Sequence, residues 1–169
     1  MNQESESIPV RPTRRVKAST PAVPYQVPRY RIALVREGPA QAPSSPILTS
    51  VAAAAVLRPL FADLDREHFV VCGLDAKNSL IGTNLVSIGS VTMAIVHPRE
   101  VFKPVILMNA AGWICVHNHP SGDTTPSQED RVLTKRLREA GDLLGITLLD
   151  HLILGEGFYS FADQGWPGG

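Results

Sequence analysis

Two histidines and an aspartate lie close together in the segment HNHPSGDTTPSQED, in the second half of the sequence. His117 and His119 are separated by one residue, so on an extended backbone both imidazole rings lie on the same face of the chain. Asp130 lies in the first turn of a predicted helix, where its carboxylate can face back toward the histidines. Zinc takes imidazole nitrogen and carboxylate oxygen readily, and three protein ligands plus a water form its usual catalytic arrangement. The segment therefore indicates a metal site formed by these three residues.

The same segment also allows an interpretation that needs no metal. Histidine pairs of this spacing are common in exposed loops, and the stretch from Ser127 to Asp130 matches a helix capping box, which explains both of those residues. A carboxylate that reaches back as a cap partner cannot readily bind a metal at the same time. We favour the metal because both histidines stand at a strand end and a loop rich in glycine and proline leads from them to the helix start.

The elements that must position these residues are indicated by hydrophobic periodicity and by turn residues. Predicted helices cover residues 51–64, 99–111 and 127–144, and predicted strands cover residues 68–75, 79–89, 91–96, 113–117 and 146–154. Ser50 is predicted to cap the first helix and Pro59 to bend it, whereas Gly112 and Gly145 end the later helices. The final GWPGG is expected to be loose.

The first 46 residues differ in composition from the rest of the chain. They hold eight of the 14 prolines, and residues 1–37 carry seven Lys or Arg against three Glu. We expect a basic, proline-rich arm over 1–46, disordered over 1–27 because so little apolar surface cannot offset the entropy of ordering. Within the arm, the alternating residues 29–36 are a candidate edge strand that docks on a compact domain at 47–169.

The overall composition is that of a globular protein, with 44% hydrophobic residues and no net charge at pH 7. The absence of net charge argues against a dedicated nucleic-acid-binding protein. The two cysteines, Cys72 and Cys115, lie in apolar runs and are expected to be buried free thiols. No stretch has the roughly 20 apolar residues of a membrane span or the pattern of a secretory signal, so we expect a cytoplasmic protein without a membrane partner.

The spacing His-x-His, seven residues, Ser, two residues, Asp resembles the JAMM signature of the JAB/MPN metalloprotease superfamily. The wider segment HNHPSGDTTPSQED, the upstream HPREVFKP and the downstream LLGITLLDHLILG resemble its RadC-type branch, over about residues 47–160. This resemblance implies a cytidine-deaminase-like α/β domain of three layers, with a mixed, mostly antiparallel sheet between helices. RadC-type proteins usually carry a helix-hairpin-helix region before this domain, where the present chain has its basic arm.

The resemblance also implies a reaction. It implies one zinc ion per chain, held by His117, His119 and Asp130, which activates a water for hydrolysis of a peptide or isopeptide bond in a peptide or protein substrate. Two other functions stay open as alternatives. One is a DNA-repair-associated module that binds nucleic acid, which the basic arm supports. The other is a non-catalytic MPN scaffold, which the complete set of motif residues disfavours.

Two further residues are implied to take part in that reaction. Glu67, directly before a predicted strand, fits the glutamate that the superfamily places ahead of its first core strand and would act as general base. Its rival Glu100 lies at a predicted helix start, where an acidic residue is expected for the helix dipole alone. The Ser127 hydroxyl would donate a hydrogen bond to the oxyanion of the tetrahedral intermediate.

Asp150 and His151 are polar residues that interrupt a predicted apolar strand. They could orient a ligand imidazole, or they could bond to each other or to a neighbouring loop, and we favour the second interpretation. Asp123 follows His119 by only four residues and is expected to be a turn residue, not a ligand.

Overall fold

The structure is a computed structural model, and it describes residues 31–37, 45–89 and 96–168. The chain divides into two units, residues Met1–Ile32 and Ala33–Gly169. The described part of the first unit is confined to residues 31 and 32, so the fold presented below is that of the second unit.

The predicted edge strand at 29–36 is not present in its described part. Residues 31–37 form neither helix nor strand, and every one of them is exposed. Alternating side chains form a strand only where a neighbouring strand supplies hydrogen bonds, and no strand of the described sheet pairs with this segment. The remainder of the predicted arm up to residue 44, and all but the last residue of the strand predicted at 91–96, lie outside the described residues.

The core of the fold is a five-stranded sheet with the strand order β2-β1-β3-β4-β5. Its strands are β1 (His68–Leu74), β2 (Leu80–Ile88), β3 (Gly112–Asn118), β4 (Thr147–Leu154) and β5 (Phe158–Ser160). Neighbouring strands are antiparallel except for β3 and β4, which run parallel. The prediction of a mixed, mostly antiparallel sheet is therefore confirmed, although the short strand β5 was not predicted.

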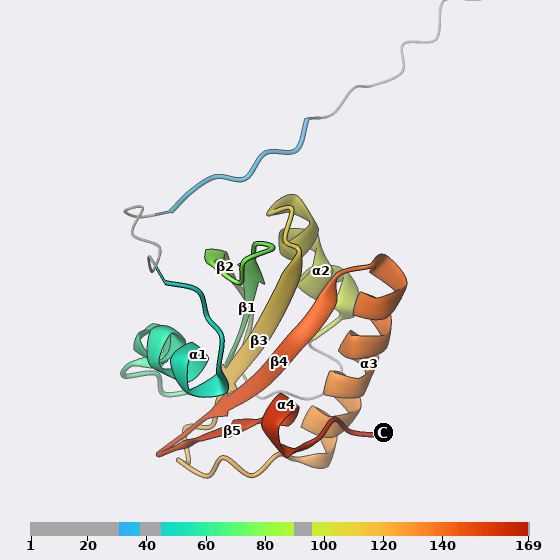
Figure 1. The fold of residues 1–169 in the computed structure, drawn as a ribbon. Coiled ribbons are helices and arrows are strands. Elements are labelled where there is room, and N and C mark those ends of the chain that lie inside the picture. Colours follow the sequence, from blue (N-terminus) through green and yellow to red (C-terminus); the bar gives the residue numbers. More distant parts are fainter. Residues whose placement is uncertain (1–30, 38–44, 90–95, 169) are drawn as a thin grey trace, which may run out of the picture. The chain divides into compact units, whose positions relative to one another are not determined.

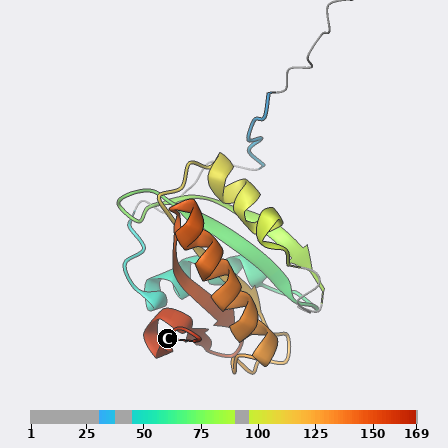
Figure 2. The same ribbon diagram turned by 90° about the vertical axis from the view of Figure 1, so that its right-hand side faces the viewer.

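Helices cover both faces of the sheet, which makes the three layers that were expected (Figures 1 and 2). The helices are α1 (Ser50–Leu57), α2 (Pro98–Leu107), α3 (Gln128–Leu144) and α4 (Phe161–Gln164). One core cluster joins α1 to the sheet, and a second joins α2 and α3 to the opposite face. The connection from β3 through α3 to β4 is the crossover that a parallel strand pair requires.

The strands alternate between these two clusters, as strands buried on both faces must. Residues of β1 and β3 that face α2 and α3 are Phe69, Val71, Trp113 and Cys115. Residues of the same strands that face α1 are Val70, Cys72, Leu74, Ile114 and Val116. This alternation decides which polar side chains can meet at the carboxyl end of β3.

The first helix begins and ends differently from its prediction. Thr49 is the N-cap in place of Ser50, and its hydroxyl oxygen accepts a hydrogen bond from the Ala52 N–H at 3.1 Å. Pro59 does not bend a longer helix, because α1 gives way to the short 3₁₀ helix η1 (Arg58–Phe61). Proline has no N–H donor with which to continue the α-helical hydrogen bonds.

The ends of the later helices agree only in part with their predictions. Gly145 ends α3 as predicted, with a left-handed φ of 71° that glycine adopts without strain. By contrast, α2 ends at Leu107, before the predicted end at residue 111. Asn109 there takes a left-handed φ of 52°, which breaks the helix ahead of Gly112.

Trp166 in the C-terminal tail is packed, so the expectation of a loose tail is wrong for this residue. This side chain packs against the core cluster beside α2 and α3. The Arg138 guanidinium carbon on α3 lies 4.8 Å from the centroid of the Trp166 ring, at the distance of a cation–π contact.

The two cysteines are buried and free, as predicted. Burial raises the pKa of both the Cys72 and the Cys115 thiol, so neither offers a thiolate as ligand or nucleophile. Among the helices that the structure describes, none is long and apolar enough to cross a bilayer.

The turn between β4 and β5 lies against the loop that follows β3. The Glu156 N–H donates to the Gly122 carbonyl at 2.9 Å, and the Gly155 N–H donates to the Gly157 carbonyl at 3.0 Å. A Cβ atom on Gly155 would overlap the Gly122 carbonyl oxygen, so this position has room for glycine alone. The contact holds the loop between His119 and α3 in place.

We predict that Gly155→Ala lowers the free energy of unfolding by about 1–3 kcal/mol, the usual cost of overpacking a close contact. Gly157→Ala is the matched control, because a Cβ atom there meets nothing within 4 Å. Denaturant unfolding followed by circular dichroism measures both variants. Equal stability of the two would contradict the close approach of the turn to the loop.

Candidate metal centre

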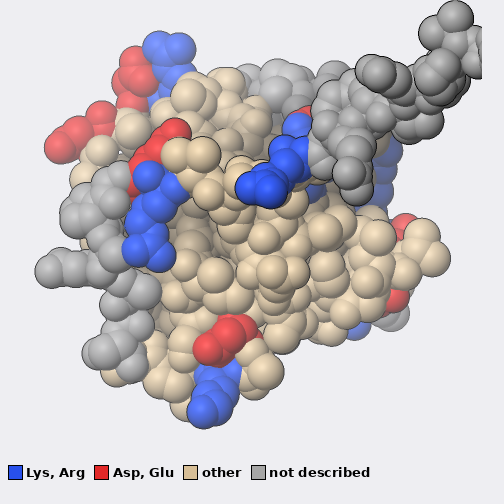
Figure 3. Space-filling model, turned by 90° about the horizontal axis from the view of Figure 1, so that it is seen from above, with Lys and Arg blue, Asp and Glu red and all other residues tan. Residues whose placement is uncertain are grey.

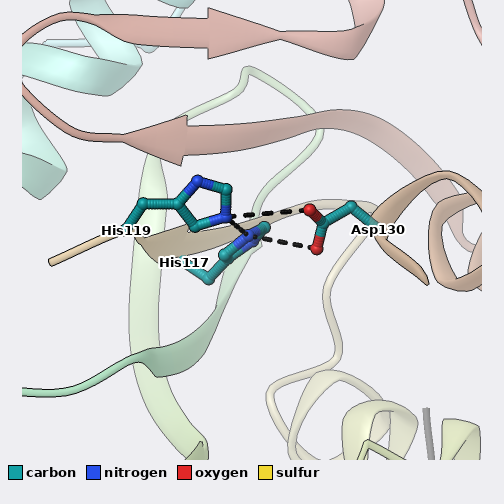
Figure 4. A group of neighbouring side chains, drawn as sticks. All are labelled: His117, His119 and Asp130. Carbon is teal, nitrogen blue, oxygen red and sulfur yellow. Dashed lines mark hydrogen bonds and ion pairs between the residues drawn. The ribbon is translucent and has the colours of Figure 1, made fainter. Parts of the chain in front are cut away.

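The three predicted ligands come together at the carboxyl end of β3. His117 is the sixth residue of that strand and is fully buried, and His119 follows the strand directly. The His119 N–H donates to the Leu154 carbonyl at 2.8 Å, which keeps the chain beside β4 after the strand ends. Asp130 lies in the first turn of α3 and is also buried. Figure 4 shows both histidine rings turned toward the Asp130 carboxylate.

The distances between the three side chains fit a single small cation. The two Nε2 atoms of His117 and His119 are 3.1 Å apart. Asp130 Oδ1 lies 3.2 Å from His117 Nε2, and Asp130 Oδ2 lies 3.7 Å from His119 Nε2. Tetrahedral coordination at zinc-ligand distances places neighbouring donor atoms about 3.3 Å apart. The group could therefore hold one metal ion, with one ligand atom from each residue.

The loop after β3 orients the His119 ring. Its Nδ1 atom lies 2.6 Å from the Asp123 carbonyl oxygen, which can only accept a hydrogen bond. Nδ1 is therefore the donor of this bond, and Nε2 is the ring nitrogen that faces His117 and Asp130. The Asp123 carboxylate instead accepts from the Thr125 N–H at 2.9 Å, as the predicted turn residue would.

Asp130 is at once a helix cap and a member of the candidate ligand group. Its Oδ2 accepts hydrogen bonds from the Ser127 N–H at 2.8 Å and from the Ser127 hydroxyl at 2.6 Å. The Ser127 oxygen accepts in return from the Asp130 N–H, which completes the capping box. Cap and metal were expected to compete, but a carboxylate has two oxygens, and here Oδ1 faces His117 while Oδ2 makes the cap bonds.

The charge of the group is held on Asp130. Burial disfavours its ionised form, but hydrogen bonds to His117 and His119 outweigh burial and hold the pKa of this carboxyl well below its usual range. Asp130 in turn raises the pKa of His119. An ionised carboxylate is thus ready at neutral pH to neutralise part of the charge of a bound cation.

The family model described as the RadC-like JAB domain matches residues 47–166 of the chain. The chain belongs to this family. The match covers most of the compact unit that holds the three predicted ligands, so the resemblance to a RadC-type JAB/MPN domain is confirmed.

Relatives of this JAB domain are proteins named UPF0758, a name that states no activity. The relative from Rubrobacter xylanophilus is 48% identical over 127 residues, which are 75% of this chain and 56% of the relative. That from Methanosarcina acetivorans is 41% identical over 153 residues, or 90% and 65% of the two chains. That from Desulforamulus reducens is 54% identical over 104 residues, or 61% and 46%. The JAB chain thus spans between 46% and 65% of the length of these relatives.

A buried chain of hydrogen bonds in the JAB domain orients His117. Thr134 donates its hydroxyl proton to the Asp130 carbonyl at 2.5 Å, so its oxygen can only accept from His151 Nδ1 at 2.6 Å. His151 Nε2 then has no proton, since burial lowers the pKa of this ring and keeps it neutral. It therefore accepts from His117 Nδ1 at 2.9 Å. His117 Nε2 is therefore the ring nitrogen that faces His119 and Asp130.

Asp150 and His151 have different roles because neighbouring strand residues face opposite sides of the sheet. His151 contacts a predicted ligand, which is the interpretation that sequence reasoning did not favour. Asp150 instead accepts from the Ser160 hydroxyl at 2.7 Å and from the Ala162 N–H at 3.0 Å, at the start of α4. The favoured interpretation, that these residues bond to a neighbouring segment and not to a ligand, is therefore correct for Asp150 alone.

Asn118 makes contacts beside the site that sequence reasoning missed. Its side-chain oxygen accepts from the His68 N–H at 2.8 Å, and its amide donates to the Arg66 carbonyl at 3.2 Å. These two backbone groups flank Glu67, whose own carbonyl accepts from the Gly89 N–H at 2.8 Å. The residue between the two histidines thus fixes the backbone that carries the predicted base. Its place inside the His-x-His motif was the available signal.

The two candidate bases lie in different surroundings. Glu67 directly precedes β1, and Phe69 of that strand pairs with His117, so the backbone of Glu67 lies at the same end of the sheet as His119. Glu100 lies in the first turn of α2, where its carboxylate meets Lys103 Nζ at 2.7 Å and Arg99 Nε at 3.2 Å. The hydrogen bond from Lys103 lowers the pKa of Glu100, which suits a surface ion pair better than a base.

We predict that His151→Phe lowers the affinity for Zn²⁺ about 10- to 100-fold, because His117 loses the partner that fixes its ring. Phenylalanine keeps a ring in the stack against Phe161 while removing both nitrogens. Asp150→Asn, on the other face of the same strand, is the control and should bind Zn²⁺ like the wild type. Competition with a fluorescent chelator measures the affinity, and unchanged binding by His151→Phe would exclude the orienting role.

Proposed function

We propose that this JAB domain is a zinc-dependent hydrolase that cleaves peptide or isopeptide bonds. The observation that carries the proposal is the convergence of two imidazole Nε2 atoms and one ionised carboxylate on one point, with separations of 3.1–3.7 Å. Two nitrogens and one carboxylate oxygen form a typical ligand set for catalytic zinc, which keeps one position open. His119 keeps 15% of its side chain exposed, so solvent reaches the centre from its side.

The donor set also favours zinc over harder cations. Calcium and magnesium prefer sites built of oxygen ligands, whereas imidazole suits zinc and its transition-metal neighbours. Zinc bound there would act as a Lewis acid that lowers the pKa of a water molecule and polarises a carbonyl group. The hydrogen bonds made by both Nδ1 atoms hold the two rings so that their Nε2 atoms face one point.

Within this proposal, Glu67 is the group that moves the proton. Its carboxylate would accept a proton from water and return it to the leaving amine, which requires a position within hydrogen-bond reach. Asn118 serves this role indirectly, because it holds the backbone on both sides of Glu67. Ser127 would donate to the developing oxyanion, and its hydroxyl must turn away from Asp130 Oδ2 to do so.

The face shown in Figure 3 offers little support for the alternative of a nucleic-acid-binding module. Figure 3 shows basic and acidic side chains interspersed on the face viewed there, with uncharged surface between them. A module that binds nucleic acid by its phosphates carries a basic patch or stripe. The scaffold alternative is disfavoured because His117, His119 and Asp130 are all present and lie close together.

We predict that the purified protein binds about one Zn²⁺ per chain after chelator treatment and reloading. His119→Ala should lose most of this zinc, because two remaining ligands close the site poorly. His97→Ala is a control that removes a histidine from the N-cap of α2, outside the group of three candidate ligands. Emission spectroscopy measures the metal content. The ligand assignment fails if His119→Ala and the wild type hold equal zinc.

We predict that Glu67→Gln keeps its zinc and loses about 10²–10⁴-fold in turnover, because the amide cannot accept a proton at neutral pH. Glu100→Gln should lose neither, since its carboxylate belongs to a surface ion pair. Asp130→Asn should lose zinc and activity together, because a neutral amide replaces an anionic ligand. Turnover is measured on free peptides and on isopeptide-linked ubiquitin-like substrates.

The outcomes test the choice of general base and the proposed peptidase activity separately. An active Glu67→Gln beside an inactive, zinc-loaded Glu100→Gln would reverse the choice of base. If the zinc-loaded wild type cleaves neither kind of substrate, the proposed peptidase activity is wrong, although the metal assignment stands or falls with the zinc measurement.

A further inference from the structure

An open cavity of about 530 Å³ adjoins the metal centre. Its walls are the segment from α1 through η1, the end of β3 with the loop after it, and the turn between β4 and β5. His119 and Asn118 line it, so the cavity is continuous with one ligand and with the residue that holds the backbone around Glu67. A substrate bound across the centre would therefore extend into this space.

The lining of the cavity is largely apolar. Its apolar side chains include Pro59, Phe61, Leu64, Pro120 and Leu154. Side chains of this kind favour an apolar group of the ligand by removing its surface from water.

Hydrogen bonds hold the walls together. The Arg58 guanidinium donates to the Gly155 carbonyl at 2.9 Å and to the Gly157 carbonyl at 2.8 Å, which ties η1 to the turn between β4 and β5. The Glu156 N–H ties the same turn to Gly122 on the third wall. The cavity is thus shaped before any ligand enters, so its occupant meets a low ordering cost.

Charged groups in the lining are mainly acidic. Asp63 and Glu156 both line the cavity, and within the described residues neither forms an ion pair. Arg58 is the basic residue of the lining, and its guanidinium is engaged with the two glycine carbonyls. A cationic group on the ligand would therefore find complementary charge beside an apolar wall.

We propose that this cavity is a substrate subsite that binds a large apolar side chain, and that Asp63 and Glu156 select a basic residue next to it. The inference rests on the proposed peptidase function, because it takes the occupant to be a segment of the peptide that crosses the metal centre. Burial of the apolar side chain supplies the affinity. The two carboxylates favour a basic over an acidic residue at the adjacent position of the peptide.

The test uses four fluorescein-labelled octapeptides of glycine and serine that differ at two adjacent central positions. The pairs at these positions are Leu-Lys, Leu-Glu, Ser-Lys and Ser-Glu. Binding to the full-length, zinc-loaded Glu67→Gln variant is measured by fluorescence anisotropy at low salt, so that bound peptide stays intact. We expect Leu-Lys to bind about tenfold tighter than Ser-Lys. We expect it to bind about two- to fivefold tighter than Leu-Glu.

Matched variants, added to the same background, assign each preference to its residues. Ala55→Trp fills the cavity and should remove the preference for Leu over Ser, whereas Val51→Trp, exposed on the same helix outside the lining, should keep it. Asp63→Asn should reduce the preference for Lys over Glu. Asparagine suits that position because residue 63 has a left-handed φ of 59°. Glu156→Gln should act in the same direction, and Glu139→Gln on the exposed side of α3 is the control.

Equal binding of the four peptides, or preferences that survive Ala55→Trp and Asp63→Asn, would overturn the subsite. Cleavage of the same peptides by the zinc-loaded wild type is scored separately. Selective binding without cleavage would contradict the peptidase activity and leave the subsite standing. Cleavage of all four peptides at equal efficiency, with equal binding, would uphold the activity and reject the subsite.

Discussion

The parallel pairing of β3 with β4 is the constraint on which the metal centre depends. Parallel neighbours need a crossover, and here α3 supplies it, so the helix must begin at the end of the sheet where β3 finishes. That geometry brings the first turn of α3 to His117. It also lays β4 beside β3, so that His151 reaches the buried side of the His117 ring. One topological choice therefore assembles residues from three elements.

The interior of the site is a polar network with every proton assigned by its neighbours. Asp130, Thr134, His151 and His117 form a chain in which each donor has one acceptor, and no buried side-chain atom of the described residues lacks a partner. A buried polar group without a hydrogen-bond partner destabilises the fold, whereas a network in which every group is bonded favours one arrangement of the core. The network begins at the backbone carbonyl of Asp130 and ends at a ring nitrogen beside its carboxylate, so the two ends are positioned by the same residue.

The proximity of His117, His119 and Asp130 could be predicted from sequence because their spacing is local. His117 and His119 share a strand end, and Asp130 starts the next helix, so no distant pairing had to be known. The main strands and the start of α3 followed from periodicity and capping residues for the same reason. Periodicity could not indicate β5, which has three residues, nor the segment at 31–37, which alternates but has no strand beside it.

Contacts that depend on strand register could not be predicted. His151 and Asn118 both meet partners far away in the sequence, and their roles follow from which face of the sheet each one occupies. The identity of the general base is of the same kind: nothing local in the sequence around Glu67 tells how close its carboxylate comes to the histidines. Cap and metal were treated as rivals because a residue was assigned one role, whereas the two oxygens of Asp130 act separately.

The three consecutive side chains of the triplet His117-Asn118-His119 bond to three different parts of the fold. These parts are β4, the start of β1 and the loop after β3. A single residue deleted from β3 ahead of this triplet would exchange the two faces of the strand, so that an imidazole would meet the entry to β1 and an amide would meet His151. The triplet can therefore accept substitutions in evolution, but a change in the number of its residues would disrupt these contacts. Variation in length has to be accommodated outside the strand, and a homologue with an altered spacing here would have to rebuild its ligand group from other residues.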